Sequence, residues 1–273
     1  MATNQQRREA AKRKLDRQLT RRAERAKRRK IVGTGVTIGV VLVVAGLVVF
    51  VVTRNNTSDA DQASESDTTT ATEATSGPCQ YEPAPEQSTG NDVGLPDDPA
   101  DTPDNGTVRA ALQTNRGTID LTLDRGEAPC TVQSTTHLIE SGFYDNTSCH
   151  RLTTSDALSV LQCGDPTGTG AGGPGYTIPD EPPDDLESAQ QDNAVIYPRG
   201  TVAMAKSLQP DSGGSQFFLV HEDSTLPPDY TVFGTIDDDD MDILDEVAEA
   251  GVDGGGDNGA PAEEVTISSA ELG

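Results

Sequence analysis

The segment Ser148–Asp165 constrains the fold of this chain more than any other stretch. It contains two short runs, Cys149–Leu152 and Leu158–Leu161, separated by the polar, turn-like Thr153–Asp156. This pattern predicts two strands joined by a tight connection. A chain that includes such a pair must place it in an antiparallel sheet.

The same hairpin would bring one cation and one amide together. Side chains alternate between the two faces of an extended strand. Arg151 projects from the first predicted strand and Gln162 from the second. If the two strands pair, these side chains are expected to lie together on one open face of the sheet.

The same alternation of side chains bears on how the four cysteines can pair. They are Cys79, Cys130, Cys149 and Cys163, an even number that indicates two disulfides in an oxidising compartment, with three possible connectivities. Cys149 shares a face with the arginine, whereas Cys163 lies on the face opposite the glutamine. This parity argues against a Cys149–Cys163 bond. Cys79 is a candidate for tying the segment before the domain to the domain itself, and the connectivity stays open.

The charge of the chain is divided unevenly. The formal net charge of the 273 residues is −25, with about +10 in residues 1–53 and about −35 in residues 54–273. Lys206 is the one lysine beyond residue 53. So acidic a region repels phosphates, which excludes nucleic acid as a partner. Its acidity serves solubility or, as a sharper hypothesis, adaptation to high salt.

An uncharged apolar run sets the predicted topology. Ile31–Thr53 carries no charged residue and, as a helix, would extend about 34 Å, enough for a hydrocarbon core of about 30 Å. The basic segment 1–30 precedes it, and no convincing cleavage site follows Val52. The positive-inside rule therefore predicts a single-pass signal anchor in the cell membrane, with residues 1–30 in the cytoplasm and the remainder outside.

Composition separates a stalk from a folded domain. Residues 54–106 are rich in Ser, Thr, Asp and Pro and poor in branched apolar residues, which predicts a disordered acidic stalk. Residues 107–273 have a globular pattern. Helices are predicted from Ala128 to Gly142 and over Met241–Ala250. The predicted strands are Val108–Gln113, Gly117–Leu123, Gly200–Met204, Gln216–Val220, Tyr230–Ile236 and Glu264–Ser268. Many short strands with two helices indicate a mainly β, antiparallel barrel.

Two segments could suggest a bound cofactor or metal, and neither has the required pattern. Pro166–Tyr176 is Gly-rich but lacks the Gly-Lys-Ser/Thr ending of a phosphate loop, so closely packed backbone beside a groove explains it better. Asp237–Asp240 lacks the alternate ligands and the glycine of a calcium loop. We therefore expect no cofactor and no metal.

Three ordered motifs resemble one family. Cys149-His150-Arg151 followed by Gln162-Cys163-Gly164-Asp165 is similar to the Phe-His-Arg and Gln-Gly-Gly-Asp motifs of the cyclophilin family of peptidyl-prolyl isomerases. Met204–Ser207 with Gly214–Phe218, and then Thr231–Gly234, follow in the family's order. The resemblance covers about residues 108–273. It implies a closed eight-stranded antiparallel barrel capped by two helices. The transmembrane helix predicted before this barrel rests on hydropathy alone.

The resemblance also implies roles for individual residues. Arg151 and Gln162 match catalytic positions, Gln216 matches a glutamine that orients substrate and arginine, and Phe218 matches the floor of the proline pocket. The other substrate-binding positions are Ala205, Lys206 and Ser207, which match a backbone-binding segment, and Val160, Leu226 and Tyr230, which match pocket positions. Without the resemblance, a surface ion pair would be the ordinary interpretation of an arginine in so acidic a domain.

Several positions depart from the family's pattern. Ser159 stands where a phenylalanine lines the pocket, and burial of such a ring contributes about 1.5–3 kcal/mol. Lys206 replaces the usual asparagine, Tyr230 a frequent histidine, and the tryptophan that many relatives carry near Thr225 is absent. Reduced proline affinity and turnover are expected from the serine.

The chemistry implied by these residues is rotation about X-Pro bonds. Amide resonance sets a barrier of about 18–20 kcal/mol, and a catalyst needs only to favour the twisted amide, with a guanidinium donating to the nitrogen lone pair. We therefore predict a monomeric peptidyl-prolyl isomerase that acts on proline-containing polypeptides and assists the folding of exported proteins. The alternatives are a non-catalytic module that binds proline-containing segments and a structural protein of the cell envelope.

Overall fold

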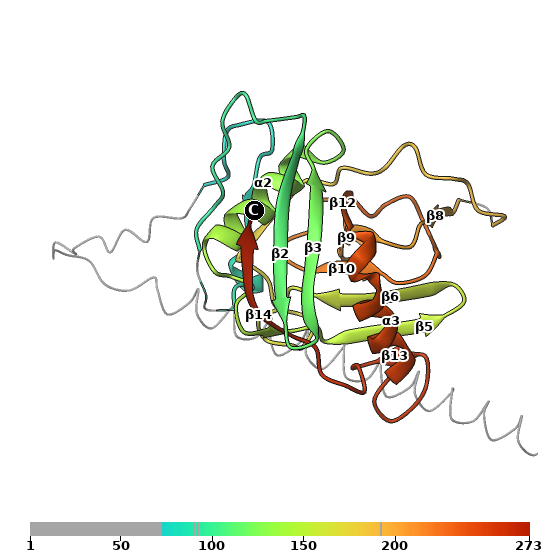
Figure 1. Ribbon diagram of the computed structural model, residues 1–273. Helices are drawn as coiled ribbons and strands as arrows, with labels where there is room; N and C mark the ends of the chain where they lie inside the picture. Colours follow the sequence, from blue (N-terminus) through green and yellow to red (C-terminus); the bar gives the residue numbers. More distant parts are fainter. Residues whose placement is uncertain (1–72, 90, 92, 192) are drawn as a thin grey trace, which may run out of the picture. The chain divides into compact units, whose positions relative to one another are not determined.

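Ten strands form one curled antiparallel sheet in the computed structural model, which describes residues 73–89, 91, 93–191 and 193–273 (Figure 1). Their order across the sheet is β13, β5, β6, β10, β9, β12, β3, β2, β14, β4. The bounds are β2 Thr107–Thr114, β3 Gly117–Asp124, β4 Thr147–Ser148, β5 Arg151–Ser155, β6 Leu158–Cys163, β9 Thr201–Met204, β10 Phe217–Val220, β12 Val232–Ile236, β13 Asn258–Gly259 and β14 Thr266–Leu272. The described part of the chain is therefore mainly β, as the sequence predicts.

Two short strand pairs and four helical segments complete the structure. The strand β1 (Glu82–Pro83) pairs with β7 (Tyr176–Thr177), and β8 (Val195–Tyr197) pairs with β11 (Ser224–Leu226). The helices are α2 (Pro129–Glu140) and α3 (Met241–Ala250), with 3-10 turns at η1 (Pro85–Gln87) and η2 (Asp238–Asp240). In Figure 1, α2 lies beside β14, and α3 lies next to β3 and β5.

The hairpin β2–β3 shows how alternation builds the core. Its strands pair along their whole length, from Thr107 opposite Asp124 to Thr114 opposite Gly117. The side chains of Ile119, Leu121 and Leu123 are buried in the main core, as the alternation along β3 requires. The predicted hairpin is confirmed.

The chain runs directly from the β4 end of the ten-stranded sheet to β5, next to the other end. Only Cys149 and His150 separate β4 from β5, and the Cys149 amide donates to the carbonyl oxygen of Val265 at 2.9 Å. The stretch 147–155 therefore pairs with β14 at its start and with β6 further on. The sequence led us to expect eight strands rather than ten. The difference arises because this stretch is divided into two strands and β13 adds a short pair at the edge.

The helix α3 has its predicted bounds, and α2 lies within the predicted range from Ala128 to Gly142. Pro129 occupies the first turn of α2, where a missing N–H costs nothing, and Gly142 follows the helix with a φ of +66°. The carboxylate of Glu181 accepts the free amides of Cys130 and Thr131 at 2.9 and 2.8 Å, which caps the positive end of the helix.

The hairpin β5–β6 differs from its prediction in where it turns. The sequence placed the turn at Thr153–Asp156, but β5 continues to Ser155 and the turn falls at Asp156 and Ala157. Threonines suit extended backbone, and Thr153 is buried, with its carbonyl oxygen 2.9 Å from Nε2 of His221. The predicted pairing of Arg151 with Gln162 is nevertheless the observed register.

The parity argument against a Cys149–Cys163 bond is wrong. These cysteines form a disulfide, with their Cα atoms 4.0 Å apart and both side chains in the main core. Parity requires continuous strand, and Cys149 lies in the break between β4 and β5, where its amide bonds to Val265 instead. The break lets its side chain turn inward, to the side of Cys163.

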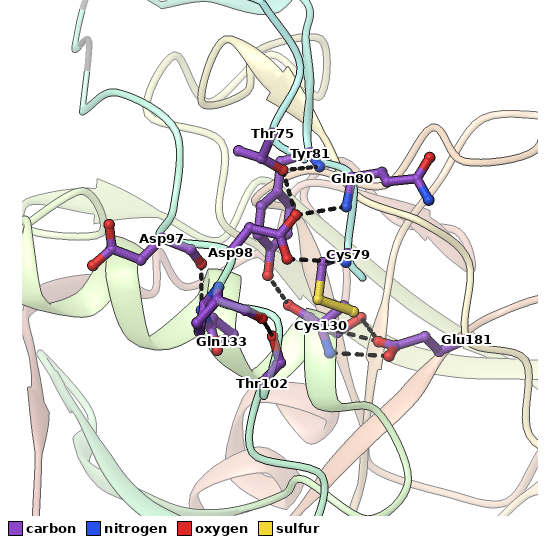
Figure 2. The surroundings of a disulfide bond; sticks show 12 residues. Thr75, Cys79, Gln80, Tyr81, Asp97, Asp98, Thr102, Cys130, Gln133 and Glu181 are labelled. Atoms are coloured by element: carbon purple, nitrogen blue, oxygen red, sulfur yellow. Dashed lines mark hydrogen bonds between the residues drawn. A yellow bond between two sulfur atoms is a disulfide. The ribbon is translucent and has the colours of Figure 1, made fainter. Parts of the chain in front are cut away.

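The second disulfide joins Cys79 to Cys130 at the start of α2, so Cys79 does tie the preceding segment to the domain. Figure 2 shows the surroundings of this bond. The carboxylate of Asp98 accepts the amides of Cys79 and Gln80 at 3.0 and 2.9 Å, and the buried Tyr81 donates its hydroxyl to Cys130 O at 2.9 Å. This part of the predicted disordered stalk is therefore ordered, because the disulfide and a buried tyrosine offset the entropy of fixing it.

The remaining predictions for the N-terminal region lie outside the described residues. They are the cytoplasmic segment 1–30, the membrane anchor Ile31–Thr53 and residues 54–72 of the stalk. Among residues 73–273, as far as they are described, no helix has the length and apolar character that a bilayer crossing needs.

Candidate active site

A row of four cross-strand partners places the predicted site residues on one face of the sheet. Arg151 on β5 lies opposite Gln162 on β6, Gln162 lies opposite Phe218 on β10, and Phe218 lies opposite Ala203 on β9. Partners directly opposite each other share a face. The neighbouring Phe217 points the other way, into the main core, so Phe218 is the phenylalanine of the pair that lines the groove.

A directional chain of hydrogen bonds begins at Arg151 and continues through Gln162 and Gln216. Nη1 of Arg151 donates to Oε1 of Gln162 at 3.2 Å, and Nε2 of Gln162 donates to Oε1 of Gln216 at 2.9 Å. Nε2 of Gln216 then donates to the carbonyl oxygens of Gly170 and Gly172 at 3.1 and 2.9 Å. Because the guanidinium only donates and the carbonyls only accept, both amides have one consistent orientation. The predicted glutamines therefore lie where they hold the arginine.

Arg151 makes no ion pair with any described residue. Its Nε donates to Oδ1 of Asn258 on β13 at 3.0 Å, so both of its hydrogen-bond partners are neutral amides. Other cations of the domain do pair with carboxylates, as Arg109 does with Asp237 and Arg199 with Asp245. The expectation of an ordinary surface ion pair does not hold for this arginine. Its positive charge stays available to a bound group.

A pocket of about 180 Å³, lined mainly by apolar and aromatic side chains together with Arg151, Gln162 and Lys206, opens beside the arginine. Its floor is Phe218, which packs edge to face against Tyr230 with ring centroids 5.7 Å apart and also lies near Tyr197. Its lining consists of Arg151, Leu158, Val160, Gln162, Ala205, Lys206, Phe218, Leu226 and Tyr230. The predicted pocket residues therefore do come together, and a proline ring is a suitable occupant for a small apolar pocket of this kind.

Ser159 does not form a wall of this pocket. It lies on the opposite face of β6 from Val160, it is buried, and its hydroxyl donates to Ser155 O at 2.9 Å. Leu158, which sequence reasoning did not select, has the parity of Val160 and lines the pocket instead. The expected loss of affinity through Ser159 therefore lacks its structural basis. Because every second residue of a strand faces the same side, counting back from Gln162 in steps of two would have identified Leu158.

A second chamber of about 280 Å³, lined mainly by glycine backbone and uncharged polar side chains, adjoins this pocket. The two share Gln162, Ala205 and Lys206. The remaining lining residues are Gln87, Gly170, Ala171, Gly172, Gly173, Ser207, Ser212, Gly214, Ser215 and Gln216. Nζ of Lys206 forms an ion pair with Asp180, and both side chains are mostly buried, which neutralises the lysine charge at the wall. Lys206 is thus a paired residue of the groove, and Ala205 and Ser207 flank it.

Asp165 folds the Gly-rich segment 166–176 that supplies the glycine carbonyls. Its buried carboxylate accepts the amides of Thr167, Gly170 and Gly172 at 2.7, 2.6 and 3.1 Å. Burial alone would raise the pKa of Asp165, but the hydrogen bonds from Thr167 and the two glycine amides outweigh it and hold the pKa below its ordinary value. The predicted account of this segment as closely packed backbone beside a groove is confirmed.

Two further residues near the site, Asn258 and Gln87, escaped the sequence prediction. Asn258 lies in a segment predicted as a flexible link, and its Asn-Gly sequence signals only a turn. Gln87 lies in the predicted stalk, and nothing in its neighbourhood signals a groove. Next to the site, His150 packs against Gly170, and burial lowers the pKa of its imidazole.

Comparisons with known proteins agree with this geometry. The family described as "Cyclophilin type peptidyl-prolyl cis-trans isomerase/CLD" matches residues 109–272. The chain is 51% identical over 197 residues to the "Probable peptidyl-prolyl cis-trans isomerase B" of Mycobacterium tuberculosis (strain H37Rv), covering 71% of this chain and 63% of that protein. The protein of the same description in Mycobacterium leprae is 53% identical over 184 residues, covering 65% and 59%. The chain thus spans just under two thirds of the length of these curated relatives.

A solved structure has the same fold. It is a cyclophilin type peptidyl-prolyl cis-trans isomerase of Cryptosporidium parvum, crystallised in the presence of the dipeptide Ala-Pro. It is 28% identical, with a TM-score of 0.50, and the match covers 60% of this chain and 98% of that one. With the family match over more than half of its residues, the chain belongs to the cyclophilin-type peptidyl-prolyl cis-trans isomerases.

Proposed function

We propose that this chain catalyses the cis–trans isomerisation of X-Pro bonds in polypeptides. The observation that carries the proposal is the position of Arg151. It has neutral amide partners, at the edge of a small apolar pocket with Phe218 as its floor. A guanidinium that is fixed but not neutralised, next to a site for a proline ring, is the arrangement that the reaction needs.

The reaction is a rotation, so the catalyst has no bond to break. Amide resonance sets a barrier of about 18–20 kcal/mol, and at the top of that barrier the prolyl nitrogen carries a localised lone pair. Arg151 can donate a hydrogen bond to this lone pair, which stabilises the twisted amide more than either planar form. Only the transition state gains this bond, so it accelerates the rotation in both directions.

The neighbouring residues have positioning roles in this proposal. The chain from Gly170 and Gly172 through Gln216 and Gln162 holds the guanidinium at the pocket before substrate arrives. A donor fixed in advance does not have to be reorganised during the reaction. Ala205, Lys206 and Ser207 border both the pocket and the adjoining chamber, where an extended peptide backbone would lie.

We extend the proposal to substrate and compartment. Proline-containing polypeptides are the proposed substrates, supported by the relative crystallised with Ala-Pro. The proposed place of action is outside the cell membrane, on exported proteins. The uncharged run 31–53 after a basic segment supports it, as do two disulfides in the domain. Protease added to intact cells should then remove the domain, and complete protection would contradict this location.

Two further features belong to the proposal. The domain acts as a monomer, since one chain supplies both the pocket and the arginine. The sheet works as a closed barrel, because the stretch 147–155 pairs with β14 at one end and β6 at the other. Closure would hold β5 and β6, and therefore Arg151 and Gln162, in a fixed register.

Exchange spectroscopy by NMR on a short Ala-Pro peptide tests the proposal. The cis and trans signals exchange over tens of seconds without a catalyst, and a substoichiometric amount of the full chain should raise the exchange rate by orders of magnitude. Phe218→Ala should weaken peptide binding, because it removes the floor of the pocket. Shifted peptide signals without faster exchange would contradict catalysis and favour the non-catalytic binding module.

A further inference from the structure

We propose that Gln87, a residue outside the family's domain, determines specificity by recognising a polar substrate side chain next to the proline. The inference rests on the proposed function and concerns the polar chamber that adjoins the apolar pocket. Family-matched residues begin at 109, whereas Gln87 comes from the segment 75–89, which we call the N-terminal strap.

The strap is held firmly at its beginning. The Cys79–Cys130 disulfide fixes it to the start of α2, and Asp98 accepts the amides of Cys79 and Gln80 (Figure 2). The ring of Tyr81 is fully buried and packs edge to face against Tyr176, with centroids 6.0 Å apart. A segment anchored by a covalent bond and a buried aromatic ring can hold a side chain in a defined place.

The strap then runs along the Gly-rich segment to the groove. The pairing of β1 with β7 is followed by hydrogen bonds of 2.7 Å from the Ala84 amide to Gly175 O and from the Gly173 amide to Gln87 O. At Gly172 a Cβ atom would lie 2.6 Å from Cγ2 of Thr89, so a side chain there would displace the strap. The glycines thus allow the strap to approach, and this approach brings Gln87 to the wall of the chamber.

Gln87 contributes the only side-chain amide of the chamber that the glutamine chain does not use. The amides of Gln162 and Gln216 are committed to each other, to Arg151 and to the glycine carbonyls. By contrast, the hydrogen bonds that the structure describes for Gln87 involve its main chain. Its carboxamide lies over Gly173, where a Cβ atom would be 3.4 Å from Oε1. An amide group can both donate to and accept from a substrate.

The chamber favours a polar, uncharged substrate side chain. Its described lining is mostly glycine backbone, serines and glutamines, with two alanines, and its one cation, Lys206, is already paired with Asp180. The chamber shares Gln162, Ala205 and Lys206 with the proline pocket, so a residue close to proline in an extended peptide reaches it. Gln87 therefore selects among substrates, while Arg151 acts on the prolyl bond.

Peptides Xaa-Ala-Pro-Yaa test this inference on the full chain. Xaa and Yaa are varied singly among alanine, glutamine, lysine and glutamate, and kcat/KM for isomerisation and Kd are measured for wild type, Gln87→Ala, Gln87→Glu and Gln87→Lys. Glu86→Ala is the matched control, since Glu86 lies exposed beside Gln87 but does not line the chamber. Circular dichroism checks that every variant is folded.

Among the peptides with glutamine at Xaa or at Yaa, one should lose about fivefold in kcat/KM when Gln87 is changed to Ala. A fivefold loss corresponds to about one hydrogen bond. The loss should lie in KM, with alanine peptides changed less than twofold. Gln87→Glu should shift preference towards lysine at that position, and Gln87→Lys towards glutamate. An unchanged order of peptides, with or without a uniform loss, would overturn the inference. If wild type binds but does not isomerise, the proposed function fails, and the order of Kd values still decides the role of Gln87.

Discussion

At the residue scale, Arg151 lies between two amide oxygens, those of Gln162 and Asn258, in a domain where other cations pair with carboxylates. The sequence could predict its nearness to Gln162, because a hairpin register determines which residues lie opposite each other. It could not predict Asn258, because that residue reaches the site through pairing between β13 and β5, more than 100 positions apart. Local pattern carries no information on so distant a pairing.

Leu158 and Ser159 are neighbours on one strand, but only Leu158 is expected to contribute to peptide binding. Leu158→Ala should weaken the binding of an Ala-Pro peptide about fivefold, because part of an apolar wall is lost and a half-buried leucine contributes about 1 kcal/mol. Ser159→Ala should change the affinity by less than twofold, since its hydroxyl faces Ser155. Titration of the peptide by NMR measures both. A larger effect at Ser159 than at Leu158 would show that the assignment of pocket faces is wrong.

At the element scale, alternation and helix-end signals predicted most of what is found. The β2–β3 hairpin, the start of α2 at its proline and the residues of α3 follow from local patterns of apolar, proline and glycine positions. Prediction failed at Cys149, where a strand is interrupted. It also failed for the segment around Cys79, which was predicted to be disordered but is ordered by a disulfide to a distant residue. Neither an interruption nor a disulfide partner is encoded in the alternation of nearby side chains.

The Gly-rich segment 166–176 should depend on the ionised form of Asp165. Its folded pKa lies below the ordinary value, so the charged carboxylate contributes stability that is present above about pH 4 and is lost as the pH falls through the folded pKa. Asp165→Asn replaces one of the two acceptor oxygens by an NH2 donor, which faces backbone amides, and should cost about 1–3 kcal/mol at pH 7.

Thermal unfolding between pH 7 and pH 3 measures this effect. The difference in melting temperature between wild type and Asp165→Asn should be largest at pH 7 and should shrink as the pH falls below about 4. Asp156→Asn is the control, because Asp156 lies exposed in the β5–β6 turn. A difference that is the same at every pH would mean that the charge of Asp165 does not hold the segment.

At the scale of the whole molecule, charge is the dominant feature. Residues 54–273 carry a formal charge of about −35, and few cations are present to offset it. The described ion pairs of Arg109, Arg116 and Arg199 are largely exposed, so solvent screening leaves each of them little stabilising effect. Repulsion among the remaining carboxylates therefore acts against the folded state and depends on salt.

Potassium chloride should consequently stabilise the domain. Raising its concentration from 0.05 to 2 M shortens the screening length from more than 10 Å to about 2–3 Å, and the melting temperature should rise by several degrees. Isomerisation activity should persist or increase over this range. Sucrose at equal osmolality serves as the control for effects of excluded solute. Loss of activity above ordinary salt would argue against adaptation to high salt and leave solubility as the role of the acidic surface.

The most direct test of the central claim compares catalysis with binding in Arg151→Ala. If the guanidinium acts on the twisted amide, kcat/KM for an Ala-Pro peptide should fall at least tenfold, the loss of a hydrogen bond to a charged donor, while Kd changes less than threefold. Arg109→Ala, on the same sheet but outside the groove, should keep full activity. A folded Arg151→Ala variant that isomerises the peptide as fast as wild type would contradict the account.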